Sequence, residues 1–381
     1  MVQLEHWAKR YVAEPILIQL IPRRTVEPSG VADYALTLAW ALRGCGGMNS
    51  LFLSATPEAQ STALEDEWET VLLPQRQPDV LSDTIETLSM SSNAAAVLLH
   101  YSGYGFQRRG VPFWLMDGLR KWKAGPGSVP LLTVCHELYA TGRPWQSSFW
   151  LSPVQKWIAR SIVGLSSRVI VPTKIYRESV LSWGIRRDSE VTCLPVFSNV
   201  GEPGCGLSPG ARPAAAVVFG LAGVEDRVFG IYRHHVERIL MALGIERVFD
   251  VGPRFSPVPS ELSGIPLIRK GTLAQGPLSK LLQQTRFGLI AYPLHAIGKS
   301  GVFAAYAAHG VVPIVLSDKR GCFDGLEPGR HFLDGLRLYG DCAAIDFASI
   351  QHELSRWYAS HDARVQADFI QQSIKVLQGA R

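Results

Sequence analysis

The sequence predicts an α/β protein made of two doubly wound domains. Apolar runs of strand length alternate with helical stretches along the chain, which is the pattern of parallel sheets covered by helices on both faces. The 381 residues exceed what one hydrophobic core usually holds. Residues 199–213 contain four glycines and three prolines, so we interpret them as a linker or hinge. Two such domains joined by a hinge would enclose a ligand cleft.

The first half of the chain contains a series of predicted strands. Residues 16–21 form an apolar run, and a turn at Gly30 leads into a helix that Gly44, Gly46 and Gly47 end. The apolar runs that follow predict strands over residues 51–53, 94–100, 129–136, 168–172 and 191–196. The run over 129–136 ends in His136, which Glu137 follows.

The alternation starts again at Ala214. Its apolar runs predict strands from residue 214 and over 247–251, 265–268, 287–292 and 311–316. Helices are predicted over residues 232–243, 278–284 and most of 347–377. A further helix of small residues begins with Gly298-Lys299-Ser300-Gly301 and ends near Gly310. Residues 287–315 thus form one βαβ unit.

The start of the helix in this βαβ unit is the best candidate phosphate site in the sequence. Open α/β sheets place ligands at the carboxyl ends of their strands, and a helix N-terminus favours an anion there. Gly298, Ser300 and Gly301 would offer backbone N–H groups, and Lys299 would add a positive charge. A P-loop is a poor match because Pro293 stands where that motif needs a glycine. The alternative is that Lys299 is a solvated surface residue.

Composition excludes several classes of protein. The net charge of +5 is small and spread out, which argues against a nucleic-acid partner. The six cysteines include no CxxC pair and are expected to be reduced thiols. No stretch is apolar for long enough to span a membrane, and no residue set has metal-ligand spacing. We therefore expect no metal, no cofactor and a cytoplasmic location, with the inner face of a membrane as an alternative.

Four segments together resemble family-4 glycosyltransferases of the GT-B fold over nearly the whole chain. Gly30-Val31-Ala32-Asp33-Tyr34 resembles the first Gly-rich loop of that family, and His136-Glu137 resembles its N-domain histidine motif. Residues 287–315 resemble the region of its EGFGLPVLEAMAAG-type motif. The tail with Trp357-Tyr358 and His361 resembles the helix that crosses back to the N-domain.

This resemblance implies the domain plan and the activity. An acceptor domain would span residues 1–200, a nucleotide-sugar donor domain 201–355, and a returning helix 356–381. The implied activity is retaining transfer of a sugar from a nucleotide-activated donor to a glycan or lipid-linked acceptor, as in polysaccharide biosynthesis. The donor is a co-substrate, and no metal is needed.

The chain departs from the family pattern at the donor site. Aligned on Gly310, the two motif glutamates, which contact the donor sugar and its ribose in the family, fall at Ile297 and Ala305. The Arg and Lys pair of the family would fall near Leu221 and Arg227, so Arg227 and Lys299 are the cations left for the diphosphate. The lost glutamates keep open an alternative, a catalytically inactive GT-B protein that binds a glycan or a protein partner.

The acid–base and donor-site candidates each have a structural alternative. His136 and Glu137 are the catalytic candidates, with His136 as a hydrogen-bond donor near the sugar and Glu137 orienting it or binding an acceptor hydroxyl. The alternative is a histidine that caps its strand. Arg227 would bind phosphate or else form surface salt bridges.

The acceptor-side candidates come from two loops. Gly30 would admit a ligand close to the backbone, and Asp33 would accept from acceptor hydroxyls or cap its own helix. The basic, aromatic stretch 104–123, with Tyr104, Arg108 and Arg109, suits a lipid phosphate or a weak contact with an anionic membrane. The alternative is a solvated basic face. Residues 145–157 are aromatic too, and we interpret them mainly as packing and cleft wall.

Overall fold

The computed structural model describes residues 15–24, 29–56, 68–203, 208–221, 223, 226–253, 259–338 and 342–379. The chain divides into two compact units. Unit 1 consists of Met1–Leu194 and Ala363–Arg381, and unit 2 of Pro195–Asp362. The chain therefore leaves unit 1 just before the Gly/Pro-rich segment 199–213, whose described residues belong to unit 2.

Unit 1 is built on a seven-stranded parallel sheet in the order β3-β2-β1-β4-β5-β6-β7. The strands are β1 (Ile16–Ile21), β2 (Asn49–Ser54), β3 (Thr70–Leu72), β4 (Ala94–Tyr101), β5 (Leu131–Cys135), β6 (Arg168–Val171) and β7 (Val191–Cys193). β1 lies between β2 and β4, so the chain order reverses there. This reversal point is where a doubly wound sheet leaves a crevice beyond its carboxyl edge.

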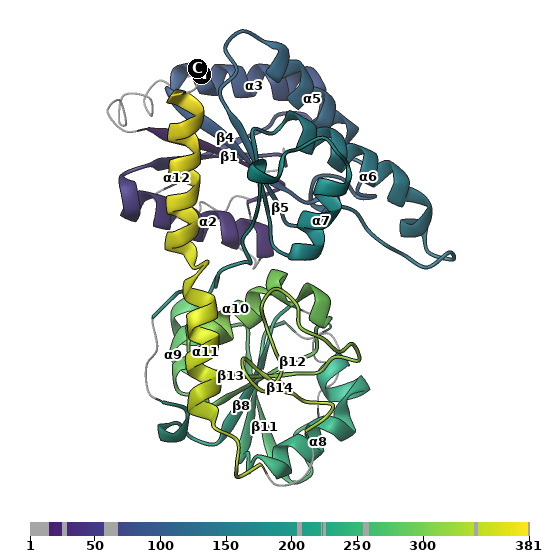
Figure 1. Cartoon of the computed structure of the whole chain (residues 1–381), viewed down its shortest axis with the longest axis vertical. Helices are drawn as coiled ribbons and strands as arrows, with labels where there is room; N and C mark the ends of the chain where they lie inside the picture. Colours follow the sequence, from purple (N-terminus) through teal and green to yellow (C-terminus); the bar gives the residue numbers. More distant parts are fainter. Residues whose placement is uncertain are drawn as a thin grey trace. The chain divides into compact units, whose positions relative to one another are not determined.

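Helices cover both faces of this sheet (Figure 1). They are α2 (Gly30–Gly46), α3 (Pro78–Ser91), α4 (Gly103–Phe106), α5 (Phe113–Ala124), α6 (Ser147–Leu165), α7 (Lys174–Ser182) and α12 (Ala363–Gly379). Side chains alternate along a strand. Ile16, Ile18 and Leu20 accordingly belong to the large core with α3, α5 and α6, whereas Ile21 packs with Ala35 of α2.

The C-terminal helix returns to unit 1, which confirms the predicted crossing. α12 lies along α2 in Figure 1, and Gln371 Nε2 donates to Leu42 O at 2.9 Å. Tyr34 OH of α2 donates to Gln366 Oε1 of α12. The helical tail contains a second helix, α11 (Phe347–Ala359), which belongs to unit 2. The return therefore begins at Ala363, after α11, and not inside it.

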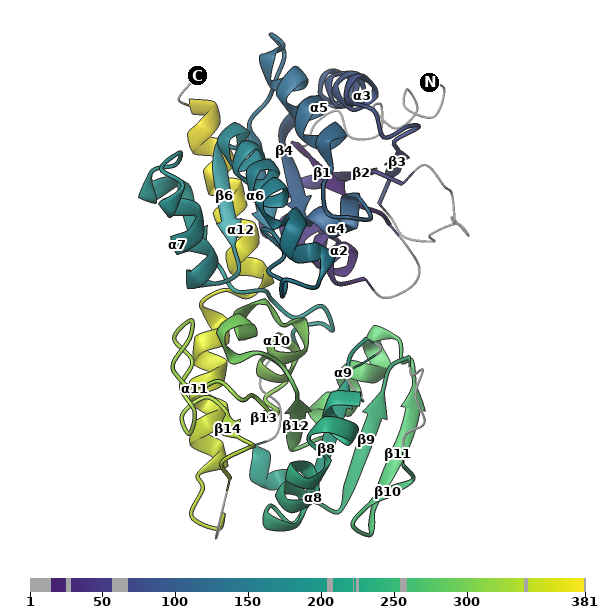
Figure 2. The ribbon, with the colours of Figure 1, turned by 90° about the vertical axis from the view of Figure 1, so that its right-hand side faces the viewer.

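Unit 2 repeats the doubly wound plan in a second seven-stranded sheet, in the order β10-β11-β9-β8-β12-β13-β14 (Figure 2). Its strands are β8 (Ala215–Phe219), β9 (Arg247–Val251), β10 (Glu261–Leu262), β11 (Ile265–Gly271), β12 (Phe287–Ile290), β13 (Val312–Val315) and β14 (Leu333–Asp334). Its helices include α8 (Arg233–Ala242), α9 (Gln275–Gln283), α10 (Gly301–Ala308) and α11. Only β10 pairs antiparallel among the named strands. Here the chain order reverses at β8, between β9 and β12.

The core of unit 2 fixes α10 against the reversal point. Tyr306 lies over Gly288 of β12, where an added Cβ would come within 2.5 Å of its ring, so only glycine fits at 288. The Tyr306 hydroxyl lies 3.0 Å from Val217 O of β8 and 3.1 Å from Leu289 O of β12. At the other end of the helix, the buried Arg212 guanidinium donates to His309 O at 2.9 Å. α10 is therefore anchored to the two strands that flank the crevice.

The start of α10 differs from the sequence prediction. Leu294–Lys299 forms a 3-10 turn (η4), and α10 begins at Gly301 with Ser300 as its N-cap. Ser300 Oγ accepts the backbone N–H of Phe303 at 3.2 Å. Gly298 and Lys299 thus precede the helix and do not open it.

Candidate functional site

The catalytic candidates lie at the carboxyl edge of the unit 1 sheet, where β5 ends. The backbone N–H of His136 donates to Tyr101 O at 2.9 Å, which continues the pairing of β4 with β5. Glu137 Oε2 accepts from Ser102 Oγ at 3.1 Å. Both side chains are half-buried, so the site is held by the protein and remains open to solvent on one side.

A row of polar side chains runs across the unit 1 sheet and ends at His136. Gln19 Nε2 of β1 donates to Ser50 Oγ of β2 at 2.8 Å. Gln19 Oε1 lies 2.8 Å from Nε2 of His100 on β4, and His100 Nδ1 lies 3.2 Å from His136 Nε2. The strands run in the order β2, β1, β4, β5, so each step joins adjacent strands. The Tyr34 ring packs edge-on against both imidazoles.

The protons in this row can be assigned. His100 is fully buried, and its burial, followed by the charge of nearby His136, holds its pKa well below the usual range. A neutral His100 has one ring N–H, which faces the Gln19 carbonyl oxygen because the amide nitrogen of Gln19 is used by Ser50. His100 Nδ1 therefore accepts from His136 Nε2–H. The His136 nitrogen that can gain or lose a proton without breaking the row is Nδ1.

The acceptor-side candidates lie at the reversal point of unit 1, in the loops after β1 and β4. Gly30 begins α2, and a Cβ there would meet no atom within 4 Å, so the backbone is open to close approach. Asp33 Oδ2 accepts the Ser29 N–H at 3.0 Å and closes the first turn of α2. This contact matches the alternative in which Asp33 caps its own helix. Tyr104 OH lies 3.2 Å from Gln155 Nε2. Binding of an acceptor by these side chains stays a prediction.

A cavity of about 400 Å³ adjoins the same loop. Gln107, Arg108, Arg109 and Val111 line it. Both arginines are exposed, and the Arg109 carbonyl is fixed by Gln155 Nε2 at 2.9 Å. The backbone of this loop is therefore held while two guanidinium groups remain available to an anion.

Two further cations of the basic stretch 104–123 form ion pairs on α5. Lys121 Nζ pairs with Asp79 at 2.9 Å, and Arg120 pairs with Asp117 at 3.2 Å. Trp114 and Leu115 are buried. These pairs favour the solvated-face alternative for α5, and contact with a lipid phosphate or a membrane stays a prediction. Arg108, Arg109 and Lys123 lie apart from these pairs, and Lys123 Nζ donates to Val129 O at 3.3 Å. Residues 145–157 were interpreted mainly as packing and cleft wall. The packing part is wrong for Trp145, Phe149, Trp150 and Trp157, which are all exposed, and the cleft-wall part stays a prediction.

The donor-side candidates lie at the reversal point of unit 2. The 3-10 turn after β12 carries Gly298 and Lys299, and Ser300 and Gly301 follow it into α10. Gly298 O accepts the Val196 N–H at 2.9 Å, which fixes the turn. Lys299 is half-buried at the end of the turn.

The sequence analysis missed two basic side chains near Lys299 in the fold. His295 lies in the same turn as Lys299, and Lys319 follows the adjacent strand β13. Partial burial, followed by the charges of Lys319 and Lys299, lowers the pKa of His295. His295 Nδ1 is buried without a hydrogen-bond partner. Lys319 follows β13, and His295 lies in the turn after β12, so adjacent strand ends bring them together. We refer to His295, Lys299 and Lys319 as the cationic cluster.

Arg227 lies in the loop after β8, on the other side of the reversal point. It is exposed on the π-helical turn Asp226–Ile231. Its charge acts on Tyr232, whose hydroxyl donates to Asp318 Oδ2 at 3.3 Å. Asp318 directly precedes Lys319, so this contact links the loop of Arg227 to the loop that carries part of the cationic cluster.

The two positions of the missing glutamates are fully buried. Ala305 is inside α10, where its carbonyl accepts from His309 Nδ1 at 2.8 Å, and Ile297 is in the 3-10 turn. A carboxylate at either position would lose its hydration, which is costly without a partner. The apolar residues Ile297 and Ala305 fit these buried positions.

Among the residues that the structure describes, no group of three or more His, Cys, Asp or Glu side chains could hold a metal ion. The described helices also include none long and apolar enough to cross a membrane. Metal independence stays a prediction.

Solved structures share this architecture over nearly their whole length. An alpha-glucosyltransferase (AGT) in complex with UDP aligns with a TM-score of 0.59 at 12% identity, covering 96% of this chain and 100% of that one. A glycosyltransferase from Rickettsia africae gives 0.59 at 11% identity, with 96% and 99% covered. The chain has the GT-B fold. A putative UDP-N-acetylglucosamine 2-epimerase from Listeria monocytogenes is similar too, with a TM-score of 0.57 at 13% identity over 95% and 96%. No protein-family model and no curated protein matches the sequence. At these identities the likeness shows the fold alone.

Proposed function

We propose that the protein is a retaining glycosyltransferase that moves a sugar from a nucleotide-activated donor to a glycan or lipid-linked acceptor in the cytoplasm. The observation that carries this proposal is the cationic cluster at the reversal point of unit 2. Doubly wound sheets bind ligands at that point. His295 and Lys299 lie in the turn that leads into α10, and Lys319 follows the neighbouring strand β13. A diphosphate is the ligand chemistry that fits such a site.

The similar structures support the class of donor. Two alpha-glucosyltransferase structures contain UDP-glucose or UDP, and a third similar structure is described as bound with UDP-2-fluoro glucose. Two alpha-glucosyltransferase structures also contain DNA. We propose a non-nucleic-acid acceptor for this chain because its net charge is only +5.

The proposed reaction assigns different tasks to residues at the carboxyl edges of the two sheets. The bond from the anomeric carbon to the diphosphate oxygen breaks, the bond to the acceptor oxygen forms with the same configuration, and the acceptor proton leaves with the diphosphate. Lys299 and Lys319, with Arg227, would stabilise the charge that develops on the departing diphosphate. As an imidazolium, His136 would donate to the sugar through Nδ1–H while its Nε2–H donates to His100, and Glu137 would bind an acceptor hydroxyl.

Thermal denaturation with a panel of nucleoside diphosphates and nucleotide sugars tests the proposal. A ligand at about 100 times its dissociation constant stabilises by about 2.7 kcal/mol. We expect one nucleotide of the panel to raise the melting temperature and the free nucleoside to leave it unchanged. No shift with any member at millimolar concentration would favour the second candidate, a non-catalytic GT-B protein, which the apolar Ala305 and Ile297 support.

The affinity for a nucleotide sugar should rise as the pH falls. The free His295 has a lowered pKa because of its burial and the two lysines. A bound diphosphate offsets those positive charges and raises that pKa, so the complex binds more protons than the free protein. The gain in affinity appears as the pH falls through the pKa of the complex and levels off below the pKa of the free protein. Between these two pKa values the affinity rises about ten-fold for each pH unit.

Titration calorimetry in two buffers of different ionisation enthalpy measures this proton uptake. A nucleotide sugar is the right probe, because the terminal phosphate of a nucleoside diphosphate itself takes up a proton at about pH 6. His295→Phe should abolish the uptake, whereas His352→Phe, an exposed histidine on α11, should retain it. Equal proton uptake by wild type and His295→Phe would remove His295 from the phosphate site.

A further inference from the structure

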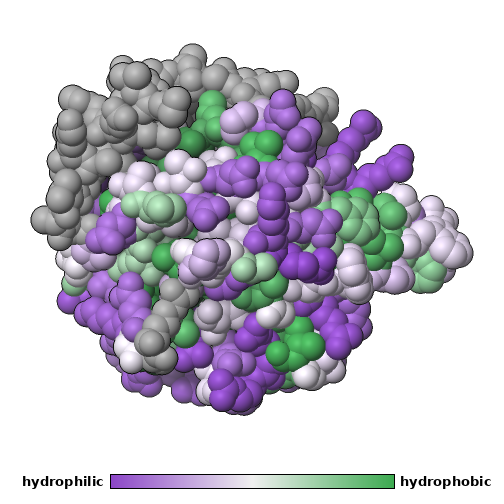
Figure 3. All heavy atoms as spheres, turned by 90° about the horizontal axis from the view of Figure 1, so that it is seen from above, coloured by the Kyte–Doolittle hydropathy of each residue, from purple (hydrophilic) through white to green (hydrophobic). Residues whose placement is uncertain are grey.

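Five large aromatic side chains form a row on the surface of unit 1. We call Phe113, Trp145, Phe149, Trp150 and Trp157 the aromatic ridge. Trp145 is 75% exposed and Trp150 70%, and Trp157 is 49% exposed on the same α6 helix two turns beyond Trp150. Seen from above in Figure 3, the segment that projects at the right carries hydrophobic side chains on its surface. Soluble domains seldom leave so much contiguous aromatic surface in water without a partner.

The ridge is ordered by specific contacts. Trp150 Nε1 donates to Pro144 O at 2.9 Å, which ties the loop of Trp145 to α6. Arg143 N–H donates to Gln146 Oε1 at 2.9 Å and Ala140 N–H to Gln155 Oε1 at 2.8 Å within the same loop. Phe149 packs edge-on against Trp150, and Phe113 lies 6.1 Å from Trp157. These contacts hold the aromatic rings outward.

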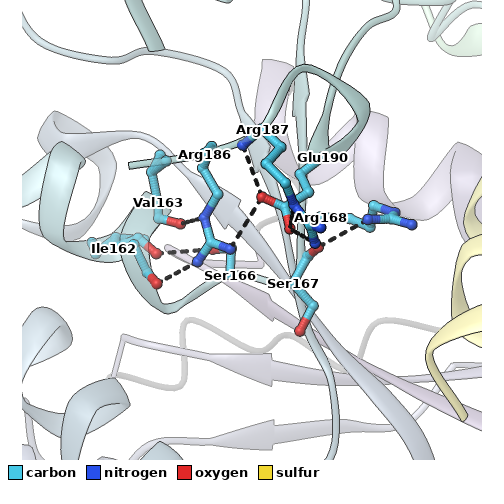
Figure 4. Close-up of polar contacts among 9 residues, drawn as sticks. Ile162, Val163, Ser166, Ser167, Arg168, Arg186, Arg187 and Glu190 are labelled. Carbon is cyan, nitrogen blue, oxygen red and sulfur yellow. Dashed lines mark hydrogen bonds and ion pairs between the residues drawn. The ribbon is translucent and has the colours of Figure 1, made fainter. Parts of the chain in front are cut away.

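The far end of α6 is fixed to the body of unit 1 (Figure 4). Arg186 Nε donates to Val163 O at 2.9 Å at the C-terminus of the helix, and Arg186 Nη2 donates to Gly164 O. Glu190 holds this guanidinium from the other side, with 3.7 Å between Nη1 and Oε2. The anchored helix therefore supports its N-terminal half as a rigid projection (Figure 1).

The ridge lies among cations, and Asp117, the acid on the α5 helix of Phe113, is paired with Arg120. Exposed Arg143, Lys156 and Arg160 flank the tryptophans, and Arg108 and Arg109 lie on the loop that Gln155 binds to α6. No Asp or Glu occurs between Glu137 and Glu178, and none between Glu86 and Asp117. Tryptophan favours the membrane–water interface, and Lys and Arg are attracted to anionic headgroups.

The charge and the shape of the aromatic ridge indicate which kind of partner it binds. A second copy docked by two-fold symmetry would bring these cations against themselves. Proteins that stack single-stranded nucleic acid do so in a groove, whereas this ridge projects. We propose that the aromatic ridge and its five cations dock unit 1 on an anionic lipid bilayer, with the tryptophans inserted at headgroup depth. This inference does not depend on the proposed sugar transfer.

Co-sedimentation with vesicles tests the docking surface. The full chain should bind vesicles of equal parts phosphatidylglycerol and phosphatidylcholine, and bind pure phosphatidylcholine far less. Binding should be lost as added salt shortens the Debye length from about 10 Å to about 3 Å. Each lysine or arginine at such a surface strengthens binding about five-fold, so Arg143→Glu with Lys156→Glu should abolish it. Trp145→Ser with Trp150→Ser should abolish the blue shift of tryptophan fluorescence on vesicle addition as well as the binding.

The matched controls are exposed residues elsewhere on unit 1. Met90→Ser, 75% exposed at the end of α3, and Lys375→Glu on α12 should bind like the wild type. The melting temperature of the charge variant should stay unchanged, because both side chains are exposed. The double tryptophan variant also loses the hydrogen bond from Trp150 Nε1 to Pro144 O, so its melting temperature should fall slightly while it stays folded. Full vesicle binding by the double tryptophan variant overturns the proposal, as does equal binding to neutral vesicles. Absence of wild-type binding also overturns it, whether the ridge then proves to join two copies in sedimentation velocity or to bind single-stranded DNA.

Discussion

His136→Ala should lower the rate of sugar transfer by about two to four orders of magnitude, the usual contribution of a positioned proton donor or acceptor. The ring is oriented by His100, whose single N–H is committed to Gln19. A side chain held in one tautomer can present Nδ1 to a substrate without first reorganising. Turnover of the donor that gives the largest thermal shift, with transfer and hydrolysis measured separately, is the readout.

Loss of folding has to be separated from loss of chemistry in this experiment. Removing His136 leaves His100 Nδ1 without its donor, which costs about 1–3 kcal/mol of stability. The nucleotide affinity of His136→Ala should nevertheless stay unchanged, because the residues proposed to bind the phosphates belong to unit 2. The control is His352→Ala on α11, which should keep full activity. Unaltered turnover by a folded His136→Ala variant would assign His136 to the structural role of capping its strand.

His100 is expected to act as a positioning residue for His136. His100→Phe keeps a ring beneath Tyr34 but removes the acceptor for His136 Nε2–H. If His100 has only a structural role, His100→Phe should lower the stability and leave the pH profile of the transfer rate unchanged. If His100 positions His136, the substitution should also shift that pH profile.

The strand framework was predictable because buried parallel strands are nearly continuous apolar runs. The run 16–21 matches β1 throughout, and the predicted run 247–251 matches β9. β10 and β14 were missed, since two residues carry no periodicity. The stretch Pro78–Ser91 contains a proline at the first helical position and the buried Leu81, Ile85 and Leu88, so α3 had a sequence signal that was not used.

The polar row behind His136 depends on strand order, which the sequence does not determine. Gln19 and His100 are far apart in the chain and meet because β1 and β4 are neighbours. A weaker signal was available: each is a polar residue within an apolar strand, and buried polar groups need partners. The cationic cluster has the same origin, since the pairing of β12 with β13 brings the loop of Lys319 next to the turn of His295 and Lys299.

The aromatic ridge shows a different limit. Trp150 and Trp157 are seven residues apart, the spacing of a buried helix face as well as of an exposed one. Periodicity tells which side chains share a face but not whether another element covers that face. Only the three-dimensional arrangement showed these tryptophans exposed to solvent.

Lys299→Ala should weaken the binding of a nucleoside diphosphate about ten- to a hundred-fold, because a charge-assisted hydrogen bond to phosphate contributes about 1.5–3 kcal/mol. Affinity for the free nucleoside should barely change. With Ala305 and Ile297 buried and apolar, donor binding has to depend on the diphosphate, and Lys299 lies between His295 and the start of α10. Titration calorimetry with the nucleoside diphosphate and the nucleoside separates the two contributions.

Stability and a matched lysine complete the test of Lys299. A positive charge before a helix N-terminus is unfavourable to the helix dipole, so its removal should leave the melting temperature nearly unchanged. Lys280→Ala, an exposed lysine on α9, should affect neither ligand, whereas Lys319→Ala should weaken the diphosphate in the same way as Lys299→Ala. If Lys299→Ala binds the diphosphate as tightly as the wild type and Lys319→Ala binds it more weakly, the phosphate lies nearer β13. If neither substitution matters, the cationic cluster is not the donor site.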